Sequence, residues 1–314
     1  MTLQLGCSPW SPAALDDSAV LVAEAQRAEA MGFDSFWLAE HHFDAQASPE
    51  PLMLLAAVAA ATTRIRLATT SYLLPLRHPL QAAAQAAVLD RLSNGRLTLG
   101  VGRGFAPELF AAYGIDPGDK RARFADCLSG MLAAWRGEPV SAGGARLSPL
   151  PVQQPHPPVW VAAFGPKALA QAGSLGLPYL ASPLETLAEL QHNHALHAEA
   201  CRAAGHPLPP ERPLIRTVFV SEDGALINTV RERLLARIAA LAGRGGRLPR
   251  SLSDRIEDWT LIGSPAEVRA QIARYRDTLG LTHLVVTGLH IAPPAGAWET
   301  SLEHLVRIAR ETAE

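Results

Sequence analysis

Short apolar runs alternate with helical stretches along almost the whole chain, and this alternation constrains the fold more than any other feature. Runs of about four to eight apolar residues are typical of strands that are buried on both faces of a sheet. The eight predicted strands are Leu3–Ser8, Ser35–Glu40, Arg66–Thr70, Leu97–Gly102, Val159–Ala163, Pro178–Ser182, Leu214–Val220 and His283–Thr287.

The stretches between these strands predict amphipathic helices, so the chain reads as repeated strand–helix units and favours a parallel sheet. Eight such units in about 300 residues is the count of a closed (β/α)₈ TIM barrel. The alternative, a doubly wound open sheet, predicts a glycine-rich turn after the first strand, where the chain has Cys7-Ser8-Pro9-Trp10. No shift in composition marks a domain boundary, so we expect one domain over residues 1–314.

The predicted helices are Asp16–Met31, a helix from Pro51, Pro79–Leu92, Lys120–Trp135, Leu184–Ala203, Ala225–Ala242 and Pro265–Leu279. Two segments interrupt the pattern. Gly137–Pro158 is rich in glycine and proline and predicts an irregular connection before the fifth strand. Gly243–Pro249 is the most flexible-looking stretch, and a loop near residues 243–259 is expected to be mobile, either as a lid over an active site or as a solvated basic loop.

Charge and cysteine content exclude several classes of protein. The formal net charge is −2 and no basic run is present, which argues against nucleic acid or an anionic membrane as a partner. Three scattered cysteines give neither a disulfide framework nor a zinc spacing. The N-terminus has no signal pattern, and the apolar run Leu52–Ala61 is too short to cross a bilayer, so we expect a soluble cytoplasmic protein.

The end of the second predicted strand carries Glu40, His41 and His42. Functional groups of a parallel barrel gather at the carboxyl ends of its strands. Alternation along the strand sends Glu40 and His42 to one face and His41 to the other. Three consecutive residues lack the spacing of a metal site, so no metal is expected. For His41 the alternatives are a catalytic role and a structural histidine at the barrel rim.

The fourth predicted strand ends in Gly100, Gly102 and Gly104, with Arg103 among them. Glycines remove side chains from a strand end and let a flat ligand or a phosphate approach the backbone, although they could equally ease helix packing. Arg103 offers a permanent charge to a phosphate.

Two later segments also favour anions. Arg121 and Arg123 lie near the start of a predicted helix, where the alternative is an exposed face paired with Asp119 or Asp126. The turn Gly165-Pro166-Lys167-Ala168 predicts a helix N-terminus with proline at its first position, whose free N–H groups favour an anion.

These segments, in this order, resemble the bacterial luciferase-like flavin-dependent monooxygenases. The likeness spans roughly residues 3 to 310, and its specificity lies in the ordered set rather than in one motif. The matching segments are Phe36–Phe43, Arg64–Ser71, Leu74–Pro79, Leu89–Arg96, Leu99–Gly104, Gln154–Pro158 and Ile262–Val268.

The resemblance implies a luciferase-like barrel, usually a dimer, that binds FMN reduced by a separate flavin reductase. The sequence gives no strong indication of a partner subunit, so we expect a homodimer rather than a heterodimer. Members of the family react with O₂ to form a flavin C4a-hydroperoxide and oxygenate a small organic substrate. By the same resemblance His41 matches a histidine that acts as a base, with Glu40 and His42 as its catalytic neighbours. The substrate itself is left open.

The resemblance also implies which residues bind the cofactor. Arg103 and Arg121 match arginines that hold the FMN phosphate, and Thr70-Ser71 falls on a non-prolyl cis peptide that lies against the flavin ring in several members. Gly102 stands where the luminescent subunit has a reactive cysteine, which argues against light emission more than against flavin use. At the phosphate-binding helix start, small hydroxyl residues are replaced by Gly165 and Ala168, so contacts there would come from backbone N–H groups of this turn, with Pro166 at N1, and from Lys167.

Two other functions stay open. Relatives on the same barrel use the deazaflavin F420 for hydride transfer without O₂. The family also contains flavin-binding barrels that have no known turnover. The pair His41-His42 after Glu40 favours the oxygen-using branch.

Overall fold

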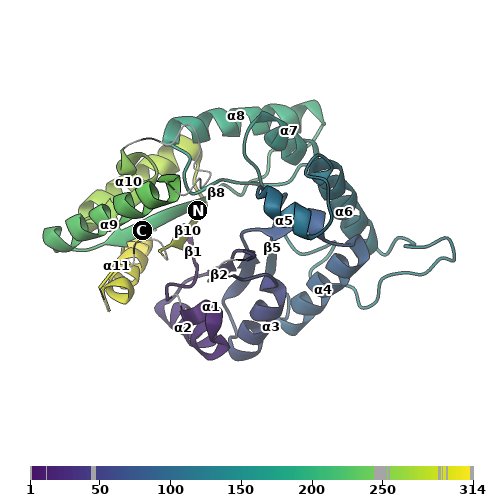
Figure 1. Ribbon diagram of the computed structural model, residues 1–314, viewed down its shortest axis with the longest axis horizontal. Coiled ribbons are helices and arrows are strands. Elements are labelled where there is room, and N and C mark those ends of the chain that lie inside the picture. Colours follow the sequence, from purple (N-terminus) through teal and green to yellow (C-terminus); the bar gives the residue numbers. More distant parts are fainter. Residues whose placement is uncertain are drawn as a thin grey trace. The chain divides into compact units, whose positions relative to one another are not determined.

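The computed structural model of the 314-residue chain describes residues 2–11, 13–43, 47–243, 253, 255–288, 291, 293–294 and 296–311, and for residues 241–243 the backbone alone. The contacts of the chain divide it into two compact units. The first unit comprises Met1–Pro12, Ala30–Ser35 and Ala163–Glu314, and the second comprises Ala13–Glu29 and Phe36–Ala162. Each unit is built from strands and covering helices (Figure 1).

The sheet of the second unit contains β2 (Ser35–Leu38), β3 (Arg66–Thr69), β5 (Leu97–Gly102) and β6 (Val159–Ala162) in the order β6-β5-β3-β2. A further short strand, β4 (Tyr72–Leu73), also pairs with β5. The pairs β3–β5, β4–β5 and β5–β6 are parallel, so the strands of these pairs end at the same edge. Every residue of β2 and β5 is buried, as expected for strands covered on both faces.

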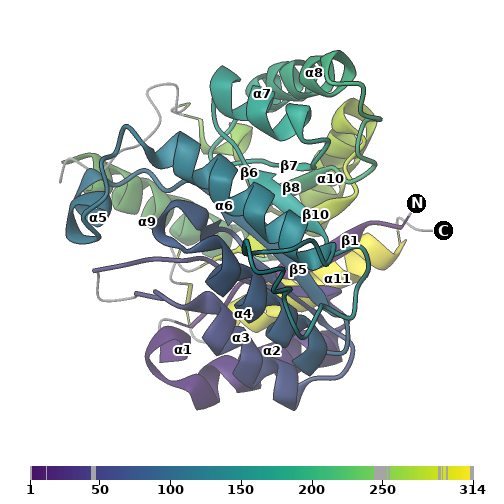
Figure 2. The same cartoon turned by 90° about the vertical axis from the view of Figure 1, so that its right-hand side faces the viewer.

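The helices of this unit begin where proline allows. Pro51, Pro79 and Pro107 are the first residues of α3 (Pro51–Ala61), α4 (Pro79–Leu92) and α5 (Pro107–Ala112), where the missing N–H costs no helical hydrogen bond. Helix α4 packs against α6 (Lys120–Trp135), as Figure 2 shows, and the indole of Trp135 donates to the Ala83 carbonyl at 3.0 Å. The remaining elements are α1 (Ala13–Asp16), α2 (Ser18–Met31) and the 3₁₀ turn η1 (Leu74–Leu76).

In the first unit the parallel strands β1 (Gln4–Cys7), β10 (His283–Thr287), β8 (Pro213–Val220) and β9 (Thr260–Gly263) pair in the order β1-β10-β8-β9. Strand β7 (Tyr179–Leu180) contacts β8. The covering elements are α7 (Pro166–Ser174), α8 (Leu187–Ala203), α9 (Gly224–Gly243), η2 (Ile256–Asp258), α10 (Pro265–Leu279) and α11 (Ala297–Glu311).

Capping residues fix the ends of two helices in this unit. Thr186 before α8 and Ser264 before α10 both form capping boxes, with Glu189 and Glu267 at the third helical position. Gly280 ends α10 at φ 68°, a left-handed conformation that glycine adopts without strain. None of the helices in the described ranges has the length and apolar character needed to cross a membrane.

The eight predicted strands are all present, and the described residues contain ten strands because β4 and β9 were not predicted. β4 has only two residues, too few to show an apolar pattern in the sequence. β9 has only four residues, Thr260–Gly263, and a strong helix signal follows it directly. Gly137–Pro158 contains neither helix nor strand, which confirms the predicted irregular connection. Of the segment predicted to be mobile, residues 244–252 and 254 lie outside the described residues, while its described part contains η2 and ends at the buried Trp259.

Candidate active site

The predicted catalytic residues lie at the carboxyl end of β2, in the second unit, with the ends of β3 and β5 in the same sheet. Glu40, His41 and His42 follow β2, Thr70 and Ser71 follow β3, Gly102 ends β5 and Arg103 comes directly after it. This edge of a parallel sheet is where barrel enzymes place their chemistry.

Glu40 is the centre of a buried polar network. Its side chain is 0% exposed, and its Oε1 atom lies 2.9 Å from His42 Nε2 and accepts a hydrogen bond from the Arg77 guanidinium at 2.8 Å. Its Oε2 atom accepts the N–H of Leu73 at 2.8 Å. Burial raises the pKa of Glu40, while Arg77 and these donors oppose that shift.

His42 connects Glu40 to a phenol at the surface. The His42 side chain is only 4% exposed, and its Nδ1 atom lies 3.4 Å from the hydroxyl of Tyr113, which follows α5. The rings of His42 and Tyr113 meet edge to face with centroids 5.6 Å apart. The imidazole is therefore held between a carboxylate and a phenol, the two groups that can fix its tautomer.

His41 has different surroundings from its neighbour. It is exposed, and its backbone forms an isolated antiparallel bridge with Ser48, with N···O distances of 3.2 Å and 2.9 Å. The predicted alternation is confirmed in that Glu40 and His42 meet on one side. The two histidines can therefore perform different tasks.

Arg103 and Arg121 are brought together by β5 and the first turn of α6. Burial, followed by the nearby charge of Arg121, lowers the pKa of Arg103 to about 10. Arg103 donates to the Ala162 carbonyl at 3.1 Å and lies 5.1 Å from the Phe124 ring centroid. The two guanidiniums repel one another and one of them is partly buried. An anion bound between them would reduce that repulsion.

Ser71 and Gly102 also meet. The peptide bond between Thr70 and Ser71 is cis, at the position where the resemblance predicts a non-prolyl cis peptide. The Thr70 N–H donates to the Leu38 carbonyl at 2.8 Å. A Cβ atom added to Gly102 would overlap the Ser71 hydroxyl and lie 2.9 Å from Ser71 Cβ. Glycine at position 102 therefore leaves the space that Ser71 occupies.

The predicted helix start at residues 165–168 is confirmed. α7 begins at Pro166, Gly165 is its N-cap with φ 80°, Lys167 is exposed and Ala168 is buried. These four residues belong to the first unit, whereas the other predicted site residues belong to the second. Along the chain, Gly165 lies three residues after Ala162, the carbonyl partner of Arg103.

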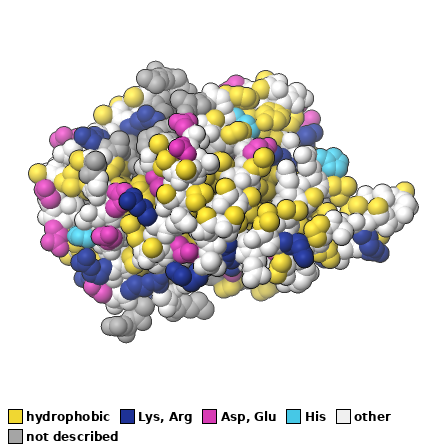
Figure 3. All heavy atoms as spheres, turned by 90° about the horizontal axis from the view of Figure 1, so that it is seen from below, with side chains coloured by type: hydrophobic (Ala, Val, Ile, Leu, Met, Phe, Trp, Pro, Cys, Tyr) yellow, Lys and Arg dark blue, Asp and Glu magenta, His cyan; other side chains and the backbone are white. Residues whose placement is uncertain are grey.

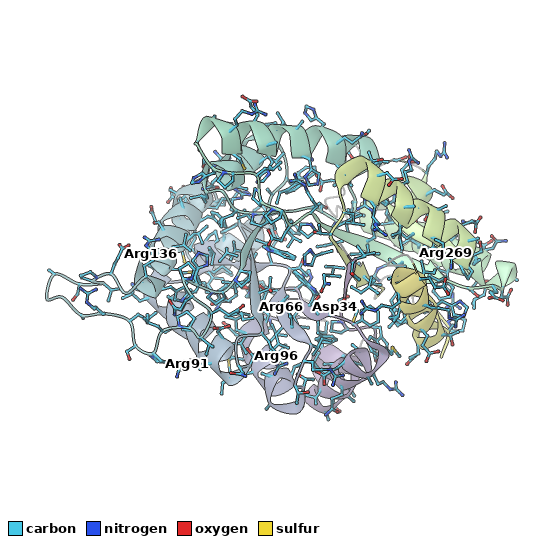
Figure 4. The ribbon with its side chains drawn as sticks, turned by 180° about the vertical axis from the view of Figure 1, so that it is seen from behind. Asp34, Arg66, Arg91, Arg96, Arg136 and Arg269 are labelled. Atoms are coloured by element: carbon cyan, nitrogen blue, oxygen red, sulfur yellow. The ribbon has the colours of Figure 1, made fainter. Side chains whose placement is uncertain are left out.

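Other arginines have structural roles. Arg66 and Arg96 lie at the amino ends of β3 and β5 (Figure 4), where Arg66 donates to the Leu97 carbonyl at 3.0 Å and Arg96 to the Ile65 carbonyl at 2.8 Å. Arg123 donates to the Pro75 carbonyl at 2.8 Å and thereby ties α6 to η1. In the part of the chain that the structure describes, no three His, Cys, Asp or Glu side chains gather as a metal site.

Sequence reasoning missed Arg77 and Tyr113. Arg77 lies within Leu74–Pro79, a segment that we matched to the family without assigning a role to its arginine. Its importance follows only from its contacts with Glu40 and with Glu50, the latter at 2.6 Å. Tyr113 follows a six-residue helix that the sequence pattern did not reveal.

Comparisons with known proteins show the family of this chain. The model of the luciferase-like monooxygenase family matches residues 4–282. The oxygenase component of flavin-dependent trigonelline monooxygenase from Acinetobacter baylyi is 30% identical over 209 residues, which cover 63% of this chain and 58% of that protein. In four curated relatives, this one included, the match covers between 38% and 62% of their length.

Solved structures match nearly the whole chain. The monooxygenase RslO1 from Streptomyces bottropensis has a TM-score of 0.80 and 26% identity, over 99% of this chain and 100% of its own. The oxygenating constituent of 3,6-diketocamphane monooxygenase from Pseudomonas putida, in complex with FMN, has a TM-score of 0.79 and 22% identity, over 98% of both chains. An F420-dependent secondary alcohol dehydrogenase has a TM-score of 0.78 and 19% identity, over 98% of this chain and 99% of its own. These likenesses confirm the predicted fold class.

Proposed function

The chain belongs to the luciferase-like monooxygenase family, and on that premise we propose that it is an FMN-dependent monooxygenase that uses reduced flavin and O₂ to oxygenate a small organic substrate. The observation that carries the proposal is the pair Arg103 and Arg121 at the carboxyl edge of the same sheet that holds Glu40, His41 and His42. A phosphate-anchored cofactor and an acid–base group are the two things that this chemistry needs from the protein.

The residues present fit the phosphate of FMN. Burial and like charge both lower the pKa of Arg103, so a dianion would recover free energy at this position. Gly165, Pro166, Lys167 and Ala168 form the N-terminus of a helix, where N–H groups and the helix dipole favour negative charge. Arg103 and Arg121 would then hold the phosphate, and a cofactor-binding role of residues 165–168, which belong to the other unit, stays a prediction from the resemblance.

Thr70, Ser71 and Gly102 would hold the flavin ring. Gly102 presents no side chain at the end of β5, and Ser71 fills the space beside it. When bound, the reduced flavin supplies the electrons that activate O₂. His41, exposed at the end of β2, would hold or accept a proton there, and Glu40 and His42 form the adjoining polar wall.

The alternative on the same fold is F420-dependent hydride transfer. The FMN complex and the F420 enzyme resemble this chain at 22% and 19% identity, so the fold alone does not choose between the two cofactors. The 30% identity with a flavin-dependent oxygenase component favours the oxygen-using reaction and a separate flavin reductase as the source of reduced flavin. A binding-only flavoprotein is the third candidate, and the intact Glu40–His42 pair argues against it.

We also propose that the protein forms a homodimer through α3 and α4. Helix α3 has no charged residue, and Met53 is 69% exposed on it, while Leu92 at the end of α4 is 60% exposed. Figure 3, which views the molecule from below, shows hydrophobic side chains exposed across the middle of that face. An exposed apolar face of two neighbouring helices suits a second copy of the chain.

The test is direct. Purified protein is titrated with reduced FMN and with reduced F420, and O₂ consumption is followed with FMN in the presence and absence of candidate aldehydes, ketones and sulfonates. The proposal expects tight binding of reduced FMN and substrate-dependent O₂ consumption. Tight binding of F420 with no O₂ consumption would favour the alternative, and flavin binding without turnover would favour the binding-only protein. Light scattering measures whether the particle has twice the mass of one chain.

A further inference from the structure

Arg77 joins two carboxylates that come from different parts of the second unit. Its guanidinium donates to Glu40 Oε1 at 2.8 Å and to Glu50 Oε1 at 2.6 Å. Only 11% of the Arg77 side chain is exposed, so the arginine is largely buried. It also lies 4.6 Å from the ring centroid of Tyr72 and donates to the Pro49 carbonyl at 3.2 Å. The arginine is therefore held from several sides, and its planar fork suits this bridging position.

The charge on Glu40 decides which nitrogen of His42 carries a proton. An ionised carboxylate can only accept hydrogen bonds, so it requires an N–H at His42 Nε2, which lies 2.9 Å from Oε1. The neutral ring then has a bare Nδ1, and the Tyr113 hydroxyl at 3.4 Å can donate to it. A protonated Glu40 would reverse this arrangement, because its O–H would donate to a bare Nε2.

Burial and the ion pair act on Glu40 in opposite directions. Its side chain is fully buried, and desolvation alone favours the neutral acid. The guanidinium of Arg77 is the positive charge in direct contact with it, while the N–H of Leu73 supports the charged form at the other oxygen. Removal of Arg77 would leave desolvation unopposed by an ion pair.

We propose that Arg77 is a positioning residue: it keeps Glu40 as a carboxylate, so that neutral His42 carries its proton on Nε2 and turns a bare Nδ1 toward Tyr113. The tautomer of His42 does not depend on the proposed function; only the use of a proton path from Tyr113 to His42 in catalysis rests on it. In that path the Tyr113 O–H bond breaks and an N–H bond forms at His42 Nδ1. The resulting phenolate then takes a proton from the substrate or solvent group that donates it. The imidazolium that results faces the Glu40 carboxylate, which stabilises it.

The path gives the site a second proton acceptor beside His41. Tyr113 is 45% exposed while the His42 side chain is 4% exposed, so the phenol is the end of the path that solvent or a substrate can reach. Glu50 pairs with the other terminal nitrogen of Arg77 and its side chain is 38% exposed. Among the interactions of the described residues, Glu50 contacts the arginine and not His42.

The experiment measures the tautomer of His42 by ¹⁵N NMR on the full-length, flavin-free protein, at a pH well above the ordinary imidazole pKa of about 6.5. Protonated and bare ring nitrogens give separate resonances, and a His42→Gln variant assigns the signal among the 11 histidines. We expect the wild-type protein to show predominantly Nε2–H. Arg77→Met should switch His42 to predominantly Nδ1–H, whereas Arg77→Lys, which keeps the charge, should restore the wild-type pattern.

Glu50→Gln is the matched control, because it removes a carboxylate from the same arginine without touching Glu40, and it should leave the tautomer unchanged. If Arg77→Met does not fold, as judged by circular dichroism, Arg77→Gln removes the charge with a smaller loss of polar contacts and carries the same expectation. A wild-type ring with Nδ1–H, or an unchanged tautomer in a folded charge-removing variant, overturns the inference. Because no flavin is present, this outcome is independent of whether the protein binds FMN or consumes O₂.

Discussion

The Nε2 atom of His42 lies 2.9 Å from the Oε1 atom of Glu40, and the two residues are two positions apart along one extended segment. Side chains at this spacing point to the same side of an extended chain, which is why they meet while His41 between them does not join the pair. The pair gives the site a buried carboxylate–imidazole unit next to an exposed histidine.

His41→Ala should lower turnover at least tenfold and leave FMN binding nearly unchanged, because a lost acid–base group affects the reaction and not the cofactor contact. Steady-state O₂ consumption and flavin fluorescence titration measure the two quantities. Equal losses in turnover and binding would instead identify His41 as a structural residue of the rim.

Arg103→Ala should weaken FMN binding roughly tenfold to a hundredfold, because a charge-assisted hydrogen bond is worth about 1.5–3 kcal/mol. Arg123→Ala is the control on the neighbouring helix, since that arginine binds the Pro75 carbonyl, and it should leave the dissociation constant unchanged. The same dissociation constant for Arg103→Ala and the wild-type protein would contradict a phosphate role for Arg103.

Tyr113→Phe should lower kcat severalfold and leave KM and thermal stability near wild type. The change removes the hydroxyl that lies 3.4 Å from His42 Nδ1 but keeps the ring that packs edge to face on the imidazole. Wild-type kcat in this variant would show that no proton passes through the phenol.

Gly102→Ala should destabilise the protein by about 1–3 kcal/mol, the usual cost of forcing an extra group into a packed site. The new Cβ would lie 2.9 Å from Ser71 Cβ and overlap the hydroxyl. A Ser71→Gly change made in the same chain should recover much of the loss, and chemical denaturation of the four proteins forms a double-mutant cycle. Strictly additive effects would mean that the two positions do not compete for space.

Acid should destabilise the first unit through His194. Burial, followed by the charges of Arg212 and His197, lowers the pKa of His194 from 6.5 to about 4. Between these values the unfolded chain binds a proton that the folded chain does not, so the free energy of unfolding falls as pH drops from about 6.5 towards 4, by up to about 3 kcal/mol. His194→Gln should reduce that loss in urea titrations at pH 7.5 and 4.5, and an identical loss in both proteins would rule out His194 as its source.

The alternation of apolar runs and helices determined the fold class, because burying a parallel strand on both faces demands a continuous apolar run that is visible in the sequence. Local signals of the same kind placed Pro166 at the start of α7 and put Glu40 and His42 on one side of the strand end. They depend on neighbouring residues only, so no tertiary contact is needed to see them.

Only the tertiary structure revealed that Arg77 contacts Glu40 across 37 positions of the sequence and that Tyr113 reaches His42 across 71. It also brought the charge of Arg121 near that of Arg103. These relationships arise when separate elements pack, and the direction of a pKa shift depends on the burial and neighbours that packing creates. Sequence spacing alone carries neither quantity, which is why it named the candidate residues but not the contacts that set their protonation.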